Sequence, residues 1–416
     1  MIVYEPKMSF DDYLQKTRVR QTREEALSKQ AIDVAFKTDK VLANVALANL
    51  NLTEPHRSAD LTESWLTQVL GAKVPGAVLE DAGIGDEHSG MTDRTLLKLS
   101  WNEAGVKANL PGSVFVKATP VFDEHREHIA ITHMGDIEVN FYTYIQPELP
   151  HIAPAAYYAR SYPGGRYILL LQDLHDLGCR PYWMGYDCSI EHARAVVTML
   201  AQLHAKFWES DRFSSDLAWL RPQTHQYGWP VRHYNFLKSR YDFLQTDMGQ
   251  SMPSEFRTLL QKYNDHDDAV YRFQEEQPCT ALHGDTHLGN TFSYPDGSAG
   301  YFDWQCMLRG FGLKDITNFI LSSLTNEQRR QHEVELIDLY IGVLEEGGIH
   351  LDKQLAWQSY CLLALESLDR NLMTINRGTY NHAEKGVLRR LECQVGSLLD
   401  HDVSGLLDCL VRKGTL

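Results

Sequence analysis

The feature that most constrains the fold is a pair of four-residue strand-like runs, at 291–294 and 299–302. The sequence Pro-Asp-Gly-Ser at 295–298 separates them, and Pro, Asp and Gly together favour a tight turn. The pattern therefore predicts a β-hairpin. In a symmetrical pairing Asn290 just precedes the first strand and Asp303 just follows the second, so we expect these side chains to be neighbours although they are 13 positions apart.

The ends of this hairpin carry the residue types that phosphoryl transfer requires. A carboxylate oxygen from Asp303 and an amide oxygen from Asn290 are hard ligands of the kind that Mg²⁺ prefers. Asp285 lies five residues before Asn290 and can accept a proton from, or orient, an incoming hydroxyl. Taken singly, these residues could be turn or capping residues. Together they predict a base and two metal-holding groups.

A metallohydrolase is the competing interpretation of the same segment. The spacing His283-x-Asp285-x-His287 superficially resembles a cluster of zinc or iron ligands. Such a site needs further ligands on other elements, and the histidines within 125–133 offer no matching motif. This alternative also leaves the hairpin between Asn290 and Asp303 unexplained, so phosphoryl transfer is favoured.

The rest of the chain separates into three regions by its hydrophobic pattern. Residues 1–59 are expected to form an accessory helical segment, with a linker at its end. Residues 60–174 contain a short helix with Asp60 as its candidate cap, strand-like runs at 95–99, 113–118 and 167–171, and a helical stretch at 135–146. From Ser189 onward the apolar residues recur at helical spacing, around 193–208, 254–275, 329–346, 353–372 and 386–411.

The motif His-Gly-Asp-x₄-Asn, ending at Asn290 and followed by a hairpin and Asp303-Trp304, resembles the catalytic motifs of the aminoglycoside phosphotransferase/choline kinase-like superfamily. Gln305 makes the second motif Asp-Trp-Gln, which is similar to the Asp-Phe-Gln of the ecdysteroid kinase-like (CHK kinase-like) branch. The resemblance extends over about 61–368. It implies an α+β, protein kinase-like two-lobed fold, with a small sheet-containing N-lobe and a large, mainly helical C-lobe.

The resemblance also implies roles for individual residues. Asp285 would be the catalytic base, His283 would brace its loop, and Asn290 and Asp303 would hold Mg²⁺. Asp315 resembles an aspartate that ties the following helix to the catalytic loop, although a simple N-cap explains it equally well. The expected domains are the accessory segment 1–59, a nucleotide-binding N-lobe over 60–174, and a catalytic and substrate-binding C-lobe over 175–416.

An ATP site is expected in the N-terminal half. Lys117, on an apolar strand, needs a partner or an anion. It resembles the phosphate-binding lysine of kinase-like folds, with Glu138 as its ion-pair partner. The glycine-rich segment 83–90 is expected to be a phosphate-covering loop, in which Gly85 and Ser89 approach the phosphates, although two acidic residues in it would repel them.

The hinge between the two halves is expected at the end of the apolar run 167–171. Gln172, Asp173 and Leu174 resemble the segment whose backbone groups pair with adenine. A core strand that runs into a loop would give the same pattern, and both interpretations can hold together.

Composition bounds the partners and the compartment. The formal net charge is −15, with 55 acidic and 40 basic residues dispersed along the chain, so binding to nucleic acid or to an anionic membrane is not expected. The seven cysteines show no Cys-x-x-Cys spacing, which favours free thiols. No apolar signal region lies within 1–30 and no apolar run suits a membrane helix. We therefore expect a cytoplasmic protein, with a homodimer through the N-terminal segment as one arrangement.

A small hydroxylated molecule is favoured over a protein as the substrate. Protein kinases carry His-Arg-Asp, Asp-Phe-Gly and Ala-Pro-Glu segments, whereas this chain has His-Gly-Asp and Asp-Trp-Gln. Aromatic residues within 182–186 and 226–241 could line the acceptor pocket or belong to the core. Steroid-like, aminoglycoside, macrolide, sugar and amino-alcohol acceptors stay open. The alternative function is a non-catalytic nucleotide-binding protein on a kinase-like fold.

Overall fold

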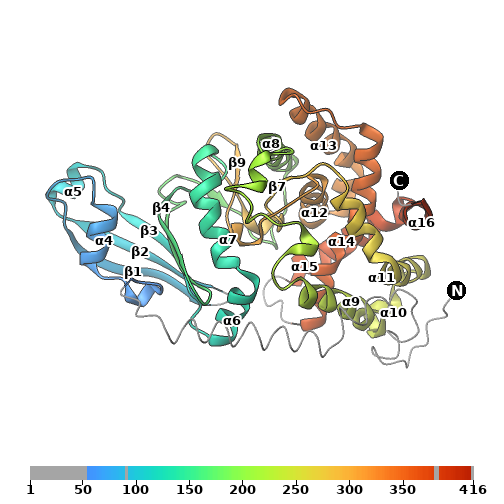
Figure 1. Cartoon of the computed structure of the whole chain (residues 1–416), viewed down its shortest axis with the longest axis horizontal. Helices are drawn as coiled ribbons and strands as arrows, with labels where there is room; N and C mark the ends of the chain where they lie inside the picture. Colours follow the sequence, from blue (N-terminus) through green and yellow to red (C-terminus); the bar gives the residue numbers. More distant parts are fainter. Residues whose placement is uncertain (1–53, 90–91, 379–383, 414–416) are drawn as a thin grey trace. The chain divides into compact units, whose positions relative to one another are not determined.

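The computed structural model describes residues 54–89, 92–378 and 384–413, which divide into two compact units. The sheet unit comprises the described residues up to Pro181 together with 292–307, and the helical unit comprises 182–291 and the described residues from Leu308 onward (Figure 1). The predicted fold class, a small sheet-containing part and a large helical part, is confirmed. Of the accessory segment 1–59, residues 1–53 lie outside the described residues, so its helix and the homodimer through it stay predictions, as do the expected domain boundaries.

The sheet unit is built on five antiparallel strands in the order β1-β2-β3-β5-β4. The predicted strands at 95–99, 113–118 and 167–171 are confirmed as β2, β3 and β5. The sequence analysis did not predict β1 and β4. The strands are β1 (Leu79–Ser89), β2 (Asp93–Trp101), β3 (Ser113–Ala118), β4 (Ala156–Tyr162) and β5 (Arg166–Gln172).

One face of this sheet is apolar and the other carries the charged residues. Leu97, Leu99, Val114 and Val116 share the apolar face and pack with the helix α4 (Glu63–Leu70). Because side chains alternate along a strand, Lys117 points to the opposite face. The helix α4 begins after Thr62, whose hydroxyl caps it, and not after Asp60 as predicted.

The helix α7 (Met134–Asn140) packs against β4 and β5. Gly135 permits this approach, because a Cβ there would lie 2.5 Å from the ring of Tyr167. The preceding helix α6 spans Asp123–Thr132, and after α7 the chain continues through a π-helical turn over Phe141–Ile145. The helical stretch predicted at 135–146 is thus confirmed, with a change of helix type after Asn140.

The predicted hairpin is confirmed. Its strands β8 (Thr291–Ser293) and β9 (Ala299–Tyr301) are neighbours in a three-stranded sheet that β6 (Arg180–Pro181) completes. The Tyr294 amide donates to the Ser298 carbonyl at 2.8 Å, which closes the turn.

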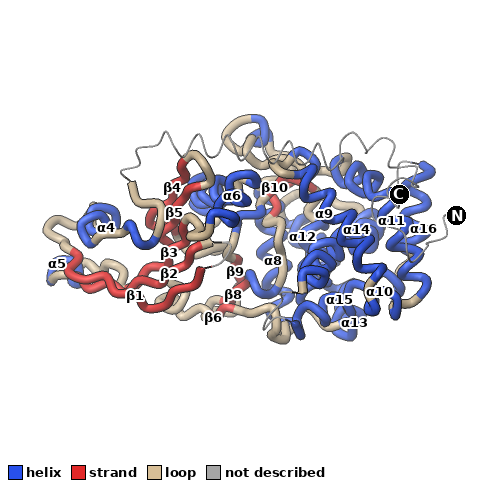
Figure 2. The backbone as a smooth tube through the Cα atoms, turned by 90° about the horizontal axis from the view of Figure 1, so that it is seen from below, coloured by secondary structure: helices blue, strands red, loops and turns tan. Residues whose placement is uncertain are grey.

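The helical unit is centred on α14 (Lys353–Arg377). This helix packs against α9 (Trp229–Gln245), α12 (Leu313–Ser323) and α15 (Glu384–Asp400) (Figure 2). An ion network on this helix is buried: Arg240 donates to Asp369 at 2.6 Å and to Asp267 at 2.8 Å. The pattern predicted over 386–411 is two helices and not one. The helices are α8 (Ile190–Lys206), α9 (Trp229–Gln245), α10 (Asp247–Ser251), α11 (Ser254–Glu275), α12 (Leu313–Ser323), α13 (Asn326–Glu346), α15 (Glu384–Asp400) and α16 (Val403–Lys413), with a strand pair β7 (Thr280–Leu282) and β10 (Leu308–Gly310).

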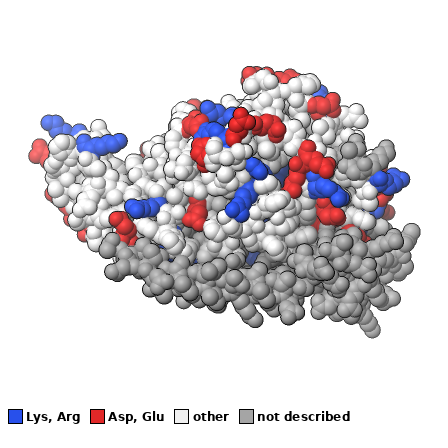
Figure 3. All heavy atoms as spheres, viewed as in Figure 1, with Lys and Arg blue, Asp and Glu red and all other residues white. Residues whose placement is uncertain are grey.

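The face of the molecule seen in Figure 3 shows acidic and basic side chains interspersed, without one large field of either sign. Among the described residues, no helix has both the length and the apolar character that crossing a membrane would require.

Candidate functional site

A buried ion cluster lies on the charged face of the sheet unit. The Lys117 Nζ lies 2.6 Å from Glu138 Oε2 and 2.6 Å from Asp303 Oδ1. Lys117 and Glu138 are 4% and 1% exposed, so both charges are almost fully removed from water. We call these three residues the Lys117 cluster. The ion pair predicted between Lys117 and Glu138 is present, and Asp303, expected only as a metal ligand, is its third member.

The charges of the Lys117 cluster are unequal. Burial lowers the pKa of Lys117, but Asp303 and Glu138 more than offset it, so the pKa is raised. Burial raises the pKa of Glu138 in spite of its ion pair with Lys117, and the charge of Asp303 raises it further. Within the cluster one cation serves two carboxylates, so the three residues together carry excess negative charge, which Arg94, the cross-strand neighbour of Lys117 on β2, partly offsets.

Local packing fixes the position of Asp303. Its backbone has φ 65°, a left-handed conformation that Asp tolerates better than most residues. The next residue, Trp304, is fully buried and stacks on Phe141 with ring centroids 4.0 Å apart, and its indole NH donates to the Tyr301 carbonyl at 3.0 Å. The Trp of the Asp-Trp motif therefore anchors the Asp to the segment that follows α7.

Among the other residues predicted to bind the nucleotide, those of the glycine-rich segment do not form the expected loop. The segment 83–89 is the second half of β1 and not a loop, because it pairs with β2 up to Ser89↔Asp93, with an irregularity between Ile84 and Asp86. Gly85 lies at this irregularity. Residues 90–91 and the side chain of Ser89 lie outside the described residues, so the roles of Gly85 and Ser89 stay predictions.

The expected hinge begins at Gln172, the last residue of β5. The Gln172 amide donates to the Ala155 carbonyl at 2.9 Å, and the Leu174 carbonyl accepts from the Cys179 amide at 2.9 Å. The Asp173 carboxylate accepts from the Ser113 hydroxyl at 2.6 Å. These contacts hold the segment to the sheet, and its pairing with adenine stays a prediction.

In the helical unit, the loop 283–290 is held by Asp315. The Asp315 carboxylate accepts from the amides of His283 at 2.7 Å and Gly284 at 3.0 Å. The Thr286 hydroxyl donates to the Asp315 carbonyl at 2.7 Å. Asp315 therefore ties α12 to this loop, as one of the two interpretations predicted, and it does not cap its own helix, whose N-cap is Gly312.

The loop also braces itself. His283 is fully buried, and its Nδ1 accepts from the Asp285 amide at 3.2 Å. The Asn290 side-chain amide donates to the Asp285 carbonyl at 3.0 Å. The contact of His283 is of the kind expected from a bracing residue. The orientation of Asn290 uses its NH₂ group within the loop, so its amide oxygen is the atom suited to a metal ion.

Two arginines that the sequence analysis did not identify adjoin Asp285. Arg370, on α14, donates from Nη1 to Asp285 Oδ1 at 2.6 Å. Burial would raise the pKa of Asp285, but Arg370, His287 and Arg390 hold it well below its ordinary value. Asp285 is therefore an ionised carboxylate. Arg370 and Arg390 follow Asp285 by 85 and 105 positions and belong to no local motif, so no signal in the sequence marked them.

Each of Asn290, in the helical unit, and Asp303, in the sheet unit, offers an oxygen atom of the kind that a hard cation prefers, and their joint role as metal ligands stays a prediction. The described residues contain no group of three or more His, Cys, Asp or Glu side chains that could hold a metal ion. His283 is not arranged as a metal ligand through Nδ1, because that atom accepts a hydrogen bond from the Asp285 amide.

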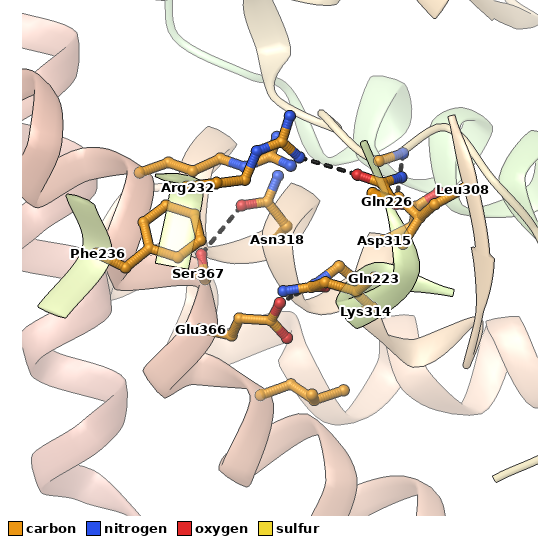
Figure 4. Close-up of a pocket in the computed structure, with 13 residues that line it drawn as sticks. Gln223, Gln226, Arg232, Phe236, Leu308, Lys314, Asp315, Asn318, Glu366 and Ser367 are labelled. Carbon is orange, nitrogen blue, oxygen red and sulfur yellow. Dashed lines mark hydrogen bonds and ion pairs between the residues drawn. The ribbon is translucent and has the colours of Figure 1, made fainter. Parts of the chain in front are cut away.

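A polar pocket in the helical unit adjoins the loop (Figure 4). Lys314 is paired with Glu366, and Arg232 donates to Gln226 at 3.0 Å. Of the candidate aromatic residues, Phe236 lines the pocket, whereas Trp229 packs with Phe236 and Tyr271 in a buried cluster. The lining residues are Gln223, Gln226, Arg232, Phe236, Gly284, Leu308, Lys314, Asp315, Asn318, Leu363, Glu366, Ser367 and Arg370.

Several solved structures are similar to this chain at low sequence identity. A choline/ethanolamine kinase family protein from Mesorhizobium loti is 10% identical, with 84% of this chain and 99% of that chain covered and a TM-score of 0.47. The choline kinase from Cryptosporidium parvum Iowa II is 10% identical, with 85% and 97% covered and a TM-score of 0.44. A spectinomycin phosphotransferase in complex with ADP and spectinomycin is 14% identical, with 85% and 99% covered and a TM-score of 0.41.

No curated protein matches this chain in sequence. A family model, by contrast, matches residues 94–353, which is more than half of the chain and includes Lys117, the loop 283–290 and Asp303. On this match the chain belongs to the ecdysteroid kinase-like family.

Proposed function

We propose that this protein is an ATP- and Mg²⁺-dependent phosphotransferase that phosphorylates a hydroxyl group of a small molecule. The observation that carries the proposal is the loop with Asp285, which Asp315 fixes and which contributes Gly284 to the wall of a polar pocket. Membership of a kinase-like family supports the same function. The pocket would hold the acceptor, with its hydroxyl directed at the Asp285 carboxylate.

Asp285 serves as the acceptor of the hydroxyl proton. Its Oδ1 accepts from Arg370, and its amide and carbonyl are bound within the loop, so the carboxylate is held in one orientation. A positioned carboxylate of this kind orients the hydroxyl and takes its proton as the new P–O bond forms. Because the hydroxyl is oriented before reaction, part of the entropic barrier is removed.

Lys117 contacts the nucleotide phosphates, and Glu138 holds the lysine in place. Asn290 and Asp303 are the residues that would hold Mg²⁺, which when bound offsets the negative charge of the phosphate oxygens. Gln172, Asp173 and Leu174 form the hinge beside the adenine, and Gly85 and Ser89 belong to the hairpin that covers the phosphates.

The lining of the pocket offers both polar and apolar contacts to an acceptor. Most of its side chains carry hydrogen-bonding groups, and Phe236 is the single aromatic residue among the lining residues. Several of the polar side chains already have partners within the protein, since Ser367 donates to Asn318 at 3.1 Å and Asn318 donates to the Thr286 carbonyl at 3.1 Å. The lining therefore suits an acceptor that combines hydroxyl or amine groups with apolar surface.

The test is ATP consumption across a panel of hydroxylated compounds, namely amino sugars, sugars, macrolides, amino alcohols and hydroxylated steroids. We expect at least one to stimulate turnover, and Asp285→Asn to lower kcat by about 10²–10⁴-fold while Mg-ATP binding persists. Asp187→Asn, at an exposed position, is the matched control and should leave kcat unchanged. Binding of Mg-ATP without phosphorylation of any compound would instead support a non-catalytic nucleotide-binding protein, and undiminished turnover in Asp285→Asn would refute the assignment of the base.

A further inference from the structure

More positive than negative charge surrounds Asp285. Arg370 donates to its carboxylate at 2.6 Å, and Arg390 is close enough for its charge to lower the pKa of the same carboxyl group. The histidines His283 and His287 act in the same direction. Orienting one carboxylate requires one cation, so the second guanidinium has no evident structural purpose at this position.

Arg390 is the more unusual of the two arginines. It lies on α15, is 5% exposed, and its Nε has no hydrogen-bond partner in the described part of the chain. Burial lowers its pKa to about 10, Asp285 opposes this effect, and the charge of Arg370 adds to it. A buried guanidinium with an unsatisfied donor and a second cation beside it is a costly arrangement unless an anion joins it.

The pocket gives an anion access to this charge. Arg370 lines the pocket together with Gly284 and Lys314, and its side chain is 29% exposed, whereas Arg390 is buried. Burial lowers the pKa of Lys314 in spite of its pairing with Glu366, and the charge of Arg370 lowers it further. The lining also includes Asp315 and Glu366, and because Lys314 is paired with Glu366, Arg370 is the cation beside the Asp285 loop that an anion in the pocket can reach.

We propose that Arg370, with the charge of Arg390 behind it, forms a phosphoryl-binding subsite that takes the phosphate of the product monoester as it forms beside Asp285. The inference rests on the proposed function and adds to it a residue for the transferred group. Arg370 can turn its guanidinium from Asp285 to the phosphoryl oxygens, and Arg390 then remains as the cation beside the Asp285 carboxylate. Planar guanidinium groups suit phosphate because they donate two parallel hydrogen bonds.

The transfer step balances with these groups alone. The bond between the γ-phosphorus of ATP and the bridging oxygen breaks, and its electron pair stays with ADP. The hydroxyl oxygen of the acceptor forms the new P–O bond, and its proton passes to Asp285. Arg370 donates hydrogen bonds to the phosphoryl oxygens, which carry the charge throughout.

The experiment titrates inorganic phosphate, as a mimic of the product phosphate, into the full chain that has been saturated with Mg-ADP, and follows binding by calorimetry. Mg-ADP keeps the nucleotide site filled, so the phosphate reports on the acceptor side. We expect Arg370→Met to weaken phosphate binding by about tenfold or more, because a charge-assisted hydrogen bond is lost. Arg370→Lys should weaken it less, since it retains the charge. The matched control is Arg389→Met on the same helix as Arg390, where the side chain pairs with Asp187 and not with Asp285, and it should bind phosphate as the wild type does.

The outcomes separate the two proposals. Absence of ADP binding by the wild type, measured first in the same cell, would count against the proposed function itself. Normal ADP binding with phosphate affinity equal in the wild type and Arg370→Met, or with no phosphate binding by the wild type, would overturn the subsite alone. A urea-unfolding transition of Arg370→Met that matches the wild type excludes misfolding as the cause of a loss, and should that variant fail to fold, the comparison of Arg370→Lys with Arg389→Met decides.

Discussion

The two units contain ion clusters of opposite excess charge. In the sheet unit one cation, Lys117, lies between two carboxylates, Glu138 and Asp303. In the helical unit one carboxylate, Asp285, adjoins two guanidinium groups. The first arrangement favours an additional cation and the second favours an additional anion.

The buried network around Arg240 in the helical unit also has one cation between two carboxylates, and here His233 contacts Asp267 at 2.8 Å and the Tyr263 hydroxyl donates to Asp369 at 3.3 Å. Arg240 pairs with Asp369 and Asp267, donates to Tyr271 at 3.3 Å, and lies over the Tyr263 ring at 3.9 Å. Asp369 directly precedes Arg370 on α14. The network therefore anchors the turn of the helix that presents Arg370 to Asp285.

The largest effect on stability is expected from removing the single cation of the Lys117 cluster. Lys117→Met removes the cation that contacts the buried Glu138 and the partly exposed Asp303, so the free energy of unfolding should fall by about 3–5 kcal/mol. Adding Glu138→Gln should restore part of this loss, because one of the two charges is then removed. Urea unfolding of the single and double variants measures both effects. Lys98→Met is the matched control on the neighbouring strand: its side chain is 56% exposed and 3.6 Å from Asp173, so little should change. A double variant that is less stable than Lys117→Met would contradict the charge imbalance.

A smaller effect on stability is expected from removing the Asp315 carboxylate. This group accepts from two backbone amides of the Asp285 loop and is not part of the Lys117 cluster. Asp315→Ala leaves the amides of His283 and Gly284 without acceptors, so we expect a loss of about 1–3 kcal/mol in unfolding free energy. Turnover should fall because Asp285 is no longer held in one orientation. Asp338→Ala, at an exposed ion pair with Lys353, serves as the control. Unchanged stability in Asp315→Ala would show that the loop is held by other contacts.

The smallest effect is a difference in pH dependence between the two clusters. Burial raises the pKa of Glu138 above its ordinary 4.5, so the folded state binds this proton more tightly than the unfolded state does. The stability of the wild type relative to Glu138→Gln should therefore improve as the pH falls through the raised pKa. Burial alone would also raise the pKa of Asp285, but Arg370 and its neighbours lower it below the ordinary 3.8. Its contribution relative to Asp285→Asn should be present above 3.8 and be lost as the pH falls below that value.

Urea unfolding of both pairs of proteins between neutral pH and about pH 3 measures this difference. We expect the two differences in unfolding free energy, each between the wild type and its variant, to change with pH in opposite directions. Slopes of the same sign would show that the excess charges of the two clusters do not differ in the way described.

Sequence and structure agree best where a local pattern decides the geometry. The turn at 295–298 and the apolar strand Ser113–Ala118 were predicted within a residue, because Pro-Asp-Gly chemistry and an apolar run act over a few positions. The segment 83–89 was predicted wrongly as a loop, because its glycines suggested one while pairing with β2 extends the strand. The sequence leaves two roles open for Asp315, an N-cap of its own helix or an acceptor for the amides of the Asp285 loop. Only the tertiary contacts in the structure distinguish them.

The arginines beside Asp285 could not be predicted by the same means. Arg370 and Arg390 lie on α14 and α15, and the packing of these helices against each other and α12 brings them to the loop. Nothing in their own neighbourhoods distinguishes them from the other arginines of the chain. The base and the candidate metal ligands were thus predictable from a contiguous motif, whereas the charges that control the base depend on long-range packing.

We propose that Mg²⁺ binds at the Lys117 cluster through Asp303 and holds the nucleotide there. Calorimetric titration of ADP into the full chain, with and without Mg²⁺, tests it most directly. We expect Mg²⁺ to strengthen ADP binding by about tenfold or more in the wild type, and this gain to vanish in Asp303→Asn but persist in Asp296→Asn, whose carboxylate is exposed on the turn of the same hairpin. ADP binding that is independent of Mg²⁺ in the wild type, or an equal gain in Asp303→Asn, would contradict the claim.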